Sequence, residues 1–233
     1  MSNNAGTLKT ATSFQFYTRL SLCELTGLKA GNLRELLSCL KIVPEAVIYH
    51  HTHHFLEEHQ YLSPEPPNDF SYWVTAALGE ALLGERLAGI NTCEFSTIQS
   101  LRDRIISVIE EFLKETQSPL RQVSGGQALY FVKSVSFVFP TPYAVNTLEE
   151  FLGALKKISI HSIFFHMFDA KLRLGRGSND FSRWIESSLG DKELAQKIAK
   201  MDPYAYTLEG LRNKIIQWIE QRRLAGVKPG EDV

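Results

Sequence analysis

Histidines gather in one short stretch of this chain. The stretch IYHHTHHFLEEHQYLSPEPPNDFSYWV, residues 48–74, holds five of the seven histidines. Imidazole nitrogens combined with a carboxylate suit zinc, iron, nickel or manganese. If residues 45–60 form a helix, side chains three and four positions apart share a face of that helix. His50 and His54 then form one pair, and His51 and His54 form another, whose face Glu58 continues. The predicted metal set is therefore His50, His51, His54 and Glu58.

The pattern leaves three interpretations of these histidines open. A two-histidine, one-carboxylate set with open positions would bind a divalent metal and activate water or oxygen. No HExxH or ExxH signature is present, and consecutive residues diverge by about 100° around a helix, so the adjacent doublets cannot all face one ion. The histidines would otherwise bind another ligand, transfer protons, or serve structure and surface.

Further ligand-binding candidates surround the metal set. They are His53, His59, Asn68, Asp69 and Trp73. The Asn-Asp pair follows a proline-rich loop, as a ligand-binding pair would. The competing interpretation is helix capping, because an Asn at the cap accepts free N–H groups and an Asp in the first turn opposes the helix dipole.

The chain carries an internal similarity. Seven of 19, five of seven and seven of 14 positions are identical in three pairs of stretches that follow one another in the same order. The pairs are 33–51 with 148–166, 68–74 with 179–185, and 97–110 with 207–220. This order predicts two copies of one unit of about 100 residues.

The predicted fold class is mainly α, with α+β as the open alternative. It consists of two duplicated helical units, each opened by a short strand, related by a pseudo-twofold axis. Alternating apolar residues in FQFYTRLSLCEL and LYFVKSVSFVF predict the strands. Pairing these strands with each other would remove their unpaired edges. Asn32 and Thr147, each followed by a Glu three residues later, predict helix starts.

The predicted domain organisation follows from the duplication. It comprises a flexible N-terminus (1–12), a first repeat unit with the His-rich helix (13–114), a linker (115–127), a second, diverged repeat unit (128–223) and a flexible C-terminus (224–233). His51 has a counterpart in His166, which suggests a role in the fold, whereas His50 is matched by Phe165. The second copy therefore cannot hold the same metal set.

Composition and sequence pattern argue against several classes of protein. The formal net charge is -1, which disfavours a nucleic-acid binder. No apolar run reaches the roughly 18 residues of a membrane span, and the first residues lack the apolar core of a signal peptide. The three cysteines, Cys23, Cys39 and Cys93, form no CxxC pair and fit a reducing, cytoplasmic setting.

The stretches ELTGLKAGNLRELL and YHHTHHFLEEHQYLSPEPPNDFSYWV resemble a family of prokaryotic proteins described as a domain of unknown function. The resemblance covers nearly the whole chain. It implies a soluble, cytoplasmic protein and brings no activity, substrate or catalytic residue.

The sequence predicts a binding module whose site for a small ligand or a divalent transition metal lies at the His-rich helix of the first repeat. One alternative is a metal-dependent enzyme that uses the same cluster. Another is a non-catalytic structural or regulatory protein that contacts a protein partner. The pattern does not decide whether the protein is an enzyme.

Overall fold

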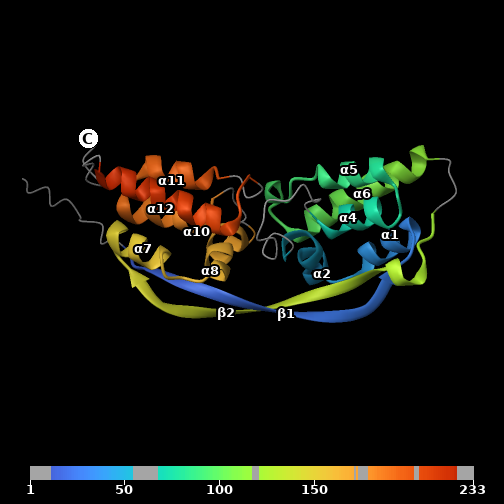
Figure 1. Ribbon diagram of the computed structural model, residues 1–233, viewed down its shortest axis with the longest axis horizontal. Coiled ribbons are helices and arrows are strands. Elements are labelled where there is room, and N and C mark those ends of the chain that lie inside the picture. The colour runs from blue at the N-terminus through green and yellow to red at the C-terminus, as the bar shows by residue number, and fades with distance from the viewer. Residues whose placement is uncertain are drawn as a thin grey trace, which may run out of the picture. The chain divides into compact units, whose positions relative to one another are not determined.

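The computed structural model describes residues 12–54, 68–116, 121–170, 172, 178–201 and 205–224. Figure 1 shows its helices and strands. The elements of the first half of the chain are β1 (Phe14–Ala30), α1 (Leu33–Ile42), α2 (Glu45–Tyr49), the π-helix η1 (His50–His54), α4 (Asp69–Ala76), α5 (Ala81–Ala88), the 3-10 helix η2 (Thr92–Glu94) and α6 (Ile98–Glu115). Those of the second half are the 3-10 helix η3 (Gly125–Gln127), β2 (Leu129–Val145), α7 (Leu148–Leu155), α8 (Ile160–Phe164), the π-helix η4 (Phe165–Asp169), α10 (Asp180–Leu189), α11 (Lys192–Ala199) and α12 (Leu208–Leu224).

The two strands pair with each other in a two-stranded sheet, which confirms the predicted pairing (Figure 1). Thr141 Oγ1 donates to the carbonyl of Phe16 at 2.9 Å, and Thr26 Oγ1 donates to the carbonyl of Phe131 at 2.8 Å. Since the residue number in one strand falls as the number in the other rises, the strands are antiparallel. Each is 17 residues long, whereas an ordinary strand has about five or six.

The chain divides into two compact units. The His166 unit contains the described residues within 1–18, 138–170 and 178–233, and the His51 unit contains those within 19–137 and 171–177. Each strand therefore begins in one unit and ends in the other.

The predicted fold class is wrong. It gave each of two duplicated helical units a short strand of its own and related the units by a pseudo-twofold axis. The structure instead has two long strands in one antiparallel sheet, and each strand is divided between the compact units. The repeat boundaries 13–114 and 128–223 concern sequence similarity rather than compactness, and they stay a prediction. Most residues of the predicted flexible termini lie outside the described residues.

Aromatic side chains build the core of the His166 unit. Phe14 and Phe16 of β1 are buried, and the rings of Phe16 and Phe151 lie 5.2 Å apart. Phe151 of α7 in turn packs edge-on against Phe181 at 5.2 Å and stacks on Trp184 at 5.2 Å. The sheet is thus joined to α7 and α10 by ring contacts, which add to the gain from burying apolar area.

The His51 unit packs the start of β2 in a similar manner. Leu129 and Phe131 are buried in one core with residues of α1, α4 and α6. Trp73 of α4 contributes its ring to this core and donates its Nε1–H to the carbonyl of Gln127 at 2.7 Å. A buried indole needs such an acceptor, because an unpaired N–H group in the core costs free energy.

Capping side chains begin the helices that follow the strands, as the sequence predicts. Asn32 accepts from the backbone N–H of Glu35 at 2.9 Å, and Thr147 accepts from that of Glu150 at 3.2 Å. These bonds satisfy N–H groups that lack partners within the helix. None of the helices in the described part of the chain combines the length and apolar character needed to cross a bilayer.

Burial along β1 is interrupted in the middle of the strand. Phe14 and Phe16 are buried, but the next buried position is Arg19, and Leu20 and Leu22 are 55% and 52% exposed. A strict period of two had predicted Phe14, Phe16, Leu20 and Leu22 on a single face. Ala30 at the end of β1 is buried again, in the core of the His51 unit. Even-numbered side chains are therefore buried at both ends of the strand, and those between them are partly or fully exposed.

We expect Phe16→Ala to lower the free energy of unfolding by about 3–5 kcal/mol, because the residue is fully buried among aromatic rings. Phe139→Ala is the matched control, since Phe139 is 47% exposed, and it should change stability by no more than about 0.5 kcal/mol. Urea unfolding of both variants measures the difference. Equal losses would contradict the assignment of Phe16 to the core.

Candidate metal centre

The histidine stretch forms two kinds of helix in place of the single α-helix expected over 45–60. Residues Glu45–Tyr49 are α-helical as α2, and His50–His54 form the π-helix η1. Thr52 Oγ1 donates to the carbonyl of Ile48 at 2.6 Å, which is the kind of side-chain bond that disturbs a regular helix. π-Helical turns are rare and often occur at functional sites.

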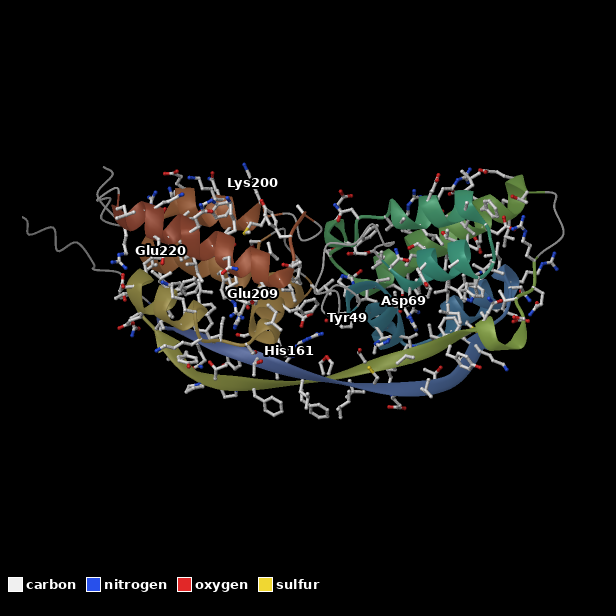
Figure 2. All side chains as sticks on the ribbon, viewed as in Figure 1. Tyr49, Asp69, His161, Lys200, Glu209 and Glu220 are labelled. Atoms are coloured by element: carbon white, nitrogen blue, oxygen red, sulfur yellow. The ribbon has the colours of Figure 1, made fainter. Side chains whose placement is uncertain are left out.

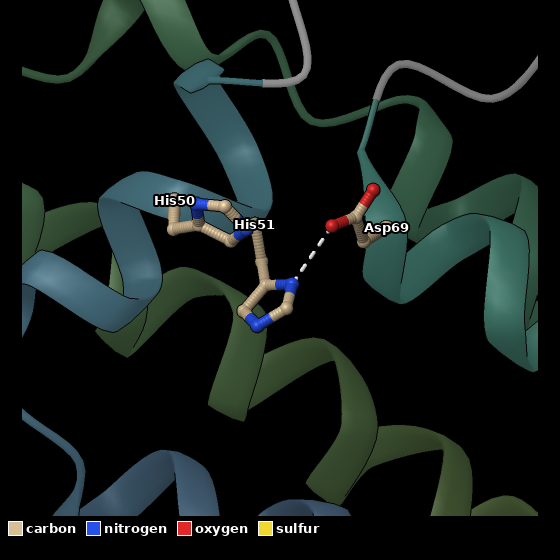
Figure 3. Close-up of side chains that lie close together, drawn as sticks. All are labelled: His50, His51 and Asp69. Carbon is tan, nitrogen blue, oxygen red and sulfur yellow. Dashed lines mark hydrogen bonds and ion pairs between the residues drawn. The ribbon is translucent and has the colours of Figure 1, made fainter. Parts of the chain in front are cut away.

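His51 is buried, and both of its ring nitrogens have partners. The backbone N–H of Val132 in β2 donates to Nε2 at 3.0 Å, and Nδ1 lies 2.8 Å from Oδ2 of Asp69 (Figure 3). Because Nε2 accepts a bond, it carries a lone pair, and the ring proton therefore resides on Nδ1, where it is donated to the carboxylate. We call this arrangement, in which an imidazole joins a strand N–H to an aspartate, a histidine bridge.

A second histidine bridge lies in the His166 unit. The backbone N–H of Tyr17 in β1 donates to Nε2 of His166 at 2.8 Å, and Nδ1 of His166 lies 2.8 Å from Oδ2 of Asp180. Both bridging histidines are no more than 3% exposed. In each unit, the bridge fastens one strand to the start of a helix, α4 or α10.

His50 adds a third metal-binding group to the bridge of the His51 unit. Its Nδ1 lies 2.9 Å from Oγ of Ser134, which is buried in β2. One potential ligand atom from each of His50, His51 and Asp69 lies within 4.8 Å of the others. Figure 3 shows the two imidazoles on η1 and the carboxylate facing them from the start of α4.

Among the residues that the structure describes, no third metal-binding group joins the bridge of the His166 unit. Phe165 precedes His166, with its ring 5.0 Å from the imidazole and almost perpendicular to it at 82°. His50 stands in the same relation to His51, at 5.0 Å and 89°. The Asp69 side chain is also more open to solvent than that of Asp180, at 35% against 17%. A metal-ligand set of this composition is therefore a feature of the His51 bridge.

Asp69 is positioned by the start of α4. Asn68 is the N-cap: its Oδ1 accepts from the backbone N–H of Ser71 at 2.9 Å, and its Nδ2 donates to the carbonyl of Leu87 at 3.2 Å. The capping interpretation of Asn68 is confirmed. Asp69 occupies the first turn, where the helix dipole favours a carboxylate.

His53 belongs to a different buried group. Its ring stacks on Tyr49 with centroids 5.3 Å apart, and its Nδ1 lies 2.9 Å from Oγ1 of Thr52. Arg19 of β1, which is 4% exposed, donates to the Tyr49 hydroxyl and lies over the same ring. Burial, and then the charge of Arg19, lower the pKa of His53 to about 4. His53 is therefore neutral at pH 7.

The structure brings together part of the predicted set. His50 and His51 approach each other and Asp69, which the sequence analysis had placed among the ligand-binding candidates. The side chain of His54, together with Glu58 and His59, lies outside the described residues. Trp73 is a core residue.

Sequence analysis missed the strand partners of the histidines. Val132 and Ser134 are 81 and 84 residues away from the histidines that they contact. The pairing of His51 with Asp69 had a visible signal. A His and an Asn-Asp pair recur together in the matched stretches, as His51 with Asp69 and as His166 with Asp180.

The chain belongs to the family of unknown function DUF5752, whose family model matches residues 11–220. This confirms the predicted resemblance to a family without an assigned activity. Among solved structures, the chain is similar to OrfY from Thermoproteus tenax, with 28% sequence identity and a TM-score of 0.77. The similarity covers 91% of this chain and 96% of that chain. No curated protein matches the chain.

We expect His53 to make the protein less stable in acid. A pKa of about 4 in the folded protein lies below the ordinary 6.5, so the unfolded chain binds a proton first as the pH falls. The contribution is present in full above about pH 6.5 and is lost between there and pH 4, with a loss of about 2–3 kcal/mol between pH 7.5 and 4.5. Urea unfolding in chelator-treated buffer should show this loss reduced in His53→Phe, and an unchanged pH dependence would contradict the assignment.

The histidine bridge predicts the effect of its removal. His166→Phe leaves the Tyr17 N–H and the Asp180 carboxylate without the imidazole, and should cost about 1–3 kcal/mol of unfolding free energy. Hydrogen exchange at the Tyr17 amide should also become faster. His161→Phe, at an exposed position of α8 in the same unit (Figure 2), is the control and should change neither quantity appreciably. An unaltered Tyr17 amide in His166→Phe would refute the bridge.

Proposed function

We propose that this protein is a binding module for a divalent transition metal, with His50, His51 and Asp69 as the ligands. The observation that carries the proposal is the approach of these three groups to within 4.8 Å of one another. Two imidazoles and one carboxylate form a donor set that suits zinc, iron, nickel or manganese.

The dimensions of the cluster support this proposal. Ligand atoms bound to one zinc ion at roughly 2.0–2.2 Å are separated by no more than about 4.4 Å. The cluster, at 4.8 Å or less, therefore needs only a small movement of its side chains. Since His50 and Asp69 are both partly open to solvent, an ion has access to the cluster and water can complete its coordination.

The second bridge supports a role for His50 beyond the fold. His166 and Asp180 bind β1 although the residue before His166 is Phe165. A bridge therefore does not require a histidine immediately before the bridging histidine. His50 is partly exposed and polar where Phe165 is buried. A role of His50 as a metal ligand would explain why this position is a histidine in the His51 unit.

The proposal predicts one equivalent of zinc per chain. Isothermal titration with Zn²⁺, on protein without a His tag and freed of metal, should give one site in the parent. His50→Phe should weaken this site about tenfold or more, because it removes a ligand, and His161→Ala is the control with unchanged binding. Thermal unfolding of each variant verifies the fold. A site of full affinity in folded His50→Phe would exclude His50 as a ligand.

The reciprocal variant tests the geometry. Phe165→His places an imidazole in front of the second bridge, where the ring relation matches that of His50 and His51. We expect a folded Phe165→His protein to bind a second equivalent of Zn²⁺. Binding of a single equivalent would mean that the exposure of Asp69, rather than the three-residue arrangement, controls the site.

A further inference from the structure

Nδ1 of His51 contacts Asp69 in the metal-free bridge, and the same nitrogen is the one that a metal ion would bind. We propose that metal binding by His51 breaks its hydrogen bond to β2, so that the strand reports whether the site is occupied. This inference rests on the proposed function and concerns the regulation of the same site. It follows from the positions of two protons, those on His51 and on the amide of Val132.

The neutral imidazole of His51 has one ring proton, which can be on Nδ1 or on Nε2. In the metal-free bridge, the proton is on Nδ1 and points to Asp69, and Nε2 accepts the N–H of Val132. A metal ion that takes the cluster must bind the lone pair of Nδ1, because Nε2 faces the backbone of β2. A neutral imidazole that ligates through Nδ1 carries its proton on Nε2. No proton is gained or lost by the ring in this exchange.

The proton on Nε2 then faces the N–H of Val132, and two donors cannot share a hydrogen bond. The 3.0 Å contact is lost, and the Val132 amide needs another acceptor. Asp69 exchanges the imidazole proton for the ion, so its negative charge remains compensated. The cost of metal binding thus falls on the strand and not on the aspartate.

Metal binding by His50 would also disturb a contact with β2. Its Nδ1 contacts Ser134, two residues beyond Val132 in β2. A movement of the His50 ring toward an ion therefore acts on β2 at a second point. Val132 and Ser134 lie in the part of β2 that belongs to the His51 unit, so this unit contains both the site and the segment that responds.

The His166 bridge provides an internal control within the same molecule. Its strand amide, that of Tyr17, is bound to the imidazole in the same way. Phe165 supplies no metal ligand to it. Zinc should therefore leave the Tyr17 amide unchanged while it acts on Val132.

Hydrogen exchange at amide resolution, with and without Zn²⁺, tests the inference on the full chain. We expect the Val132 amide to exchange about fivefold to tenfold faster with zinc, and the Tyr17 amide to keep its rate. This direction is diagnostic, because stabilisation of the folded state by a bound ligand alone slows exchange. In His50→Phe, the acceleration at Val132 should disappear at the same zinc concentration.

The outcomes separate the two proposals. If zinc binds with one equivalent that depends on His50 and the Val132 amide is unchanged or slower, the coupling to β2 is refuted, while the metal site stands. If titration detects no zinc binding, both proposals fail. Equal acceleration at Val132 and Tyr17 would mean a general loosening of both units and would also refute the coupling.

Discussion

A buried imidazole that joins a strand to a helix is the interaction on which each unit of this protein depends. The strand N–H would be costly to bury without an acceptor, and the imidazole supplies one only while it is neutral. The aspartate at the helix start orients the ring by accepting its other nitrogen's proton. A turn of π-helix carries each bridging histidine. Sheet, π-helix and capped helix therefore meet at one side chain in either unit.

The same constraint explains why the His51 bridge is suited to chemistry. A ring held at both nitrogens has little rotational freedom, so an ion that binds beside it meets an ordered site. His50 and the exposed side of Asp69 provide that addition, whereas Phe165 and the more buried Asp180 close the other bridge. A structural bond and a binding site can thus share one residue, and occupancy of the site then acts on the structure.

Local signals in the sequence predicted local features. Asn32, Thr147 and Asn68 begin helices because their side chains bond to N–H groups three residues away. Strand length was not predictable in the same way. The apolar alternation of β1 continues through Leu20 and Leu22, which are exposed, and the next buried even-numbered position is Ala30. The alternation therefore did not show how far the strand extends. The partners of His50 and His51 in β2 are distant in sequence, so only the folded chain identifies them.

The tautomer of His51 and His166 is the property that decides most directly whether the histidine bridges exist. Nitrogen NMR of ¹⁵N-histidine-labelled, metal-free protein at pH 7.5 distinguishes a protonated ring nitrogen from one with a lone pair. We expect His51 and His166 both to be neutral with the proton on Nδ1, because each Nε2 accepts the N–H of Val132 or Tyr17. A proton on Nε2 of either ring, or a doubly protonated ring, would contradict the histidine bridge and the metal coupling derived from it.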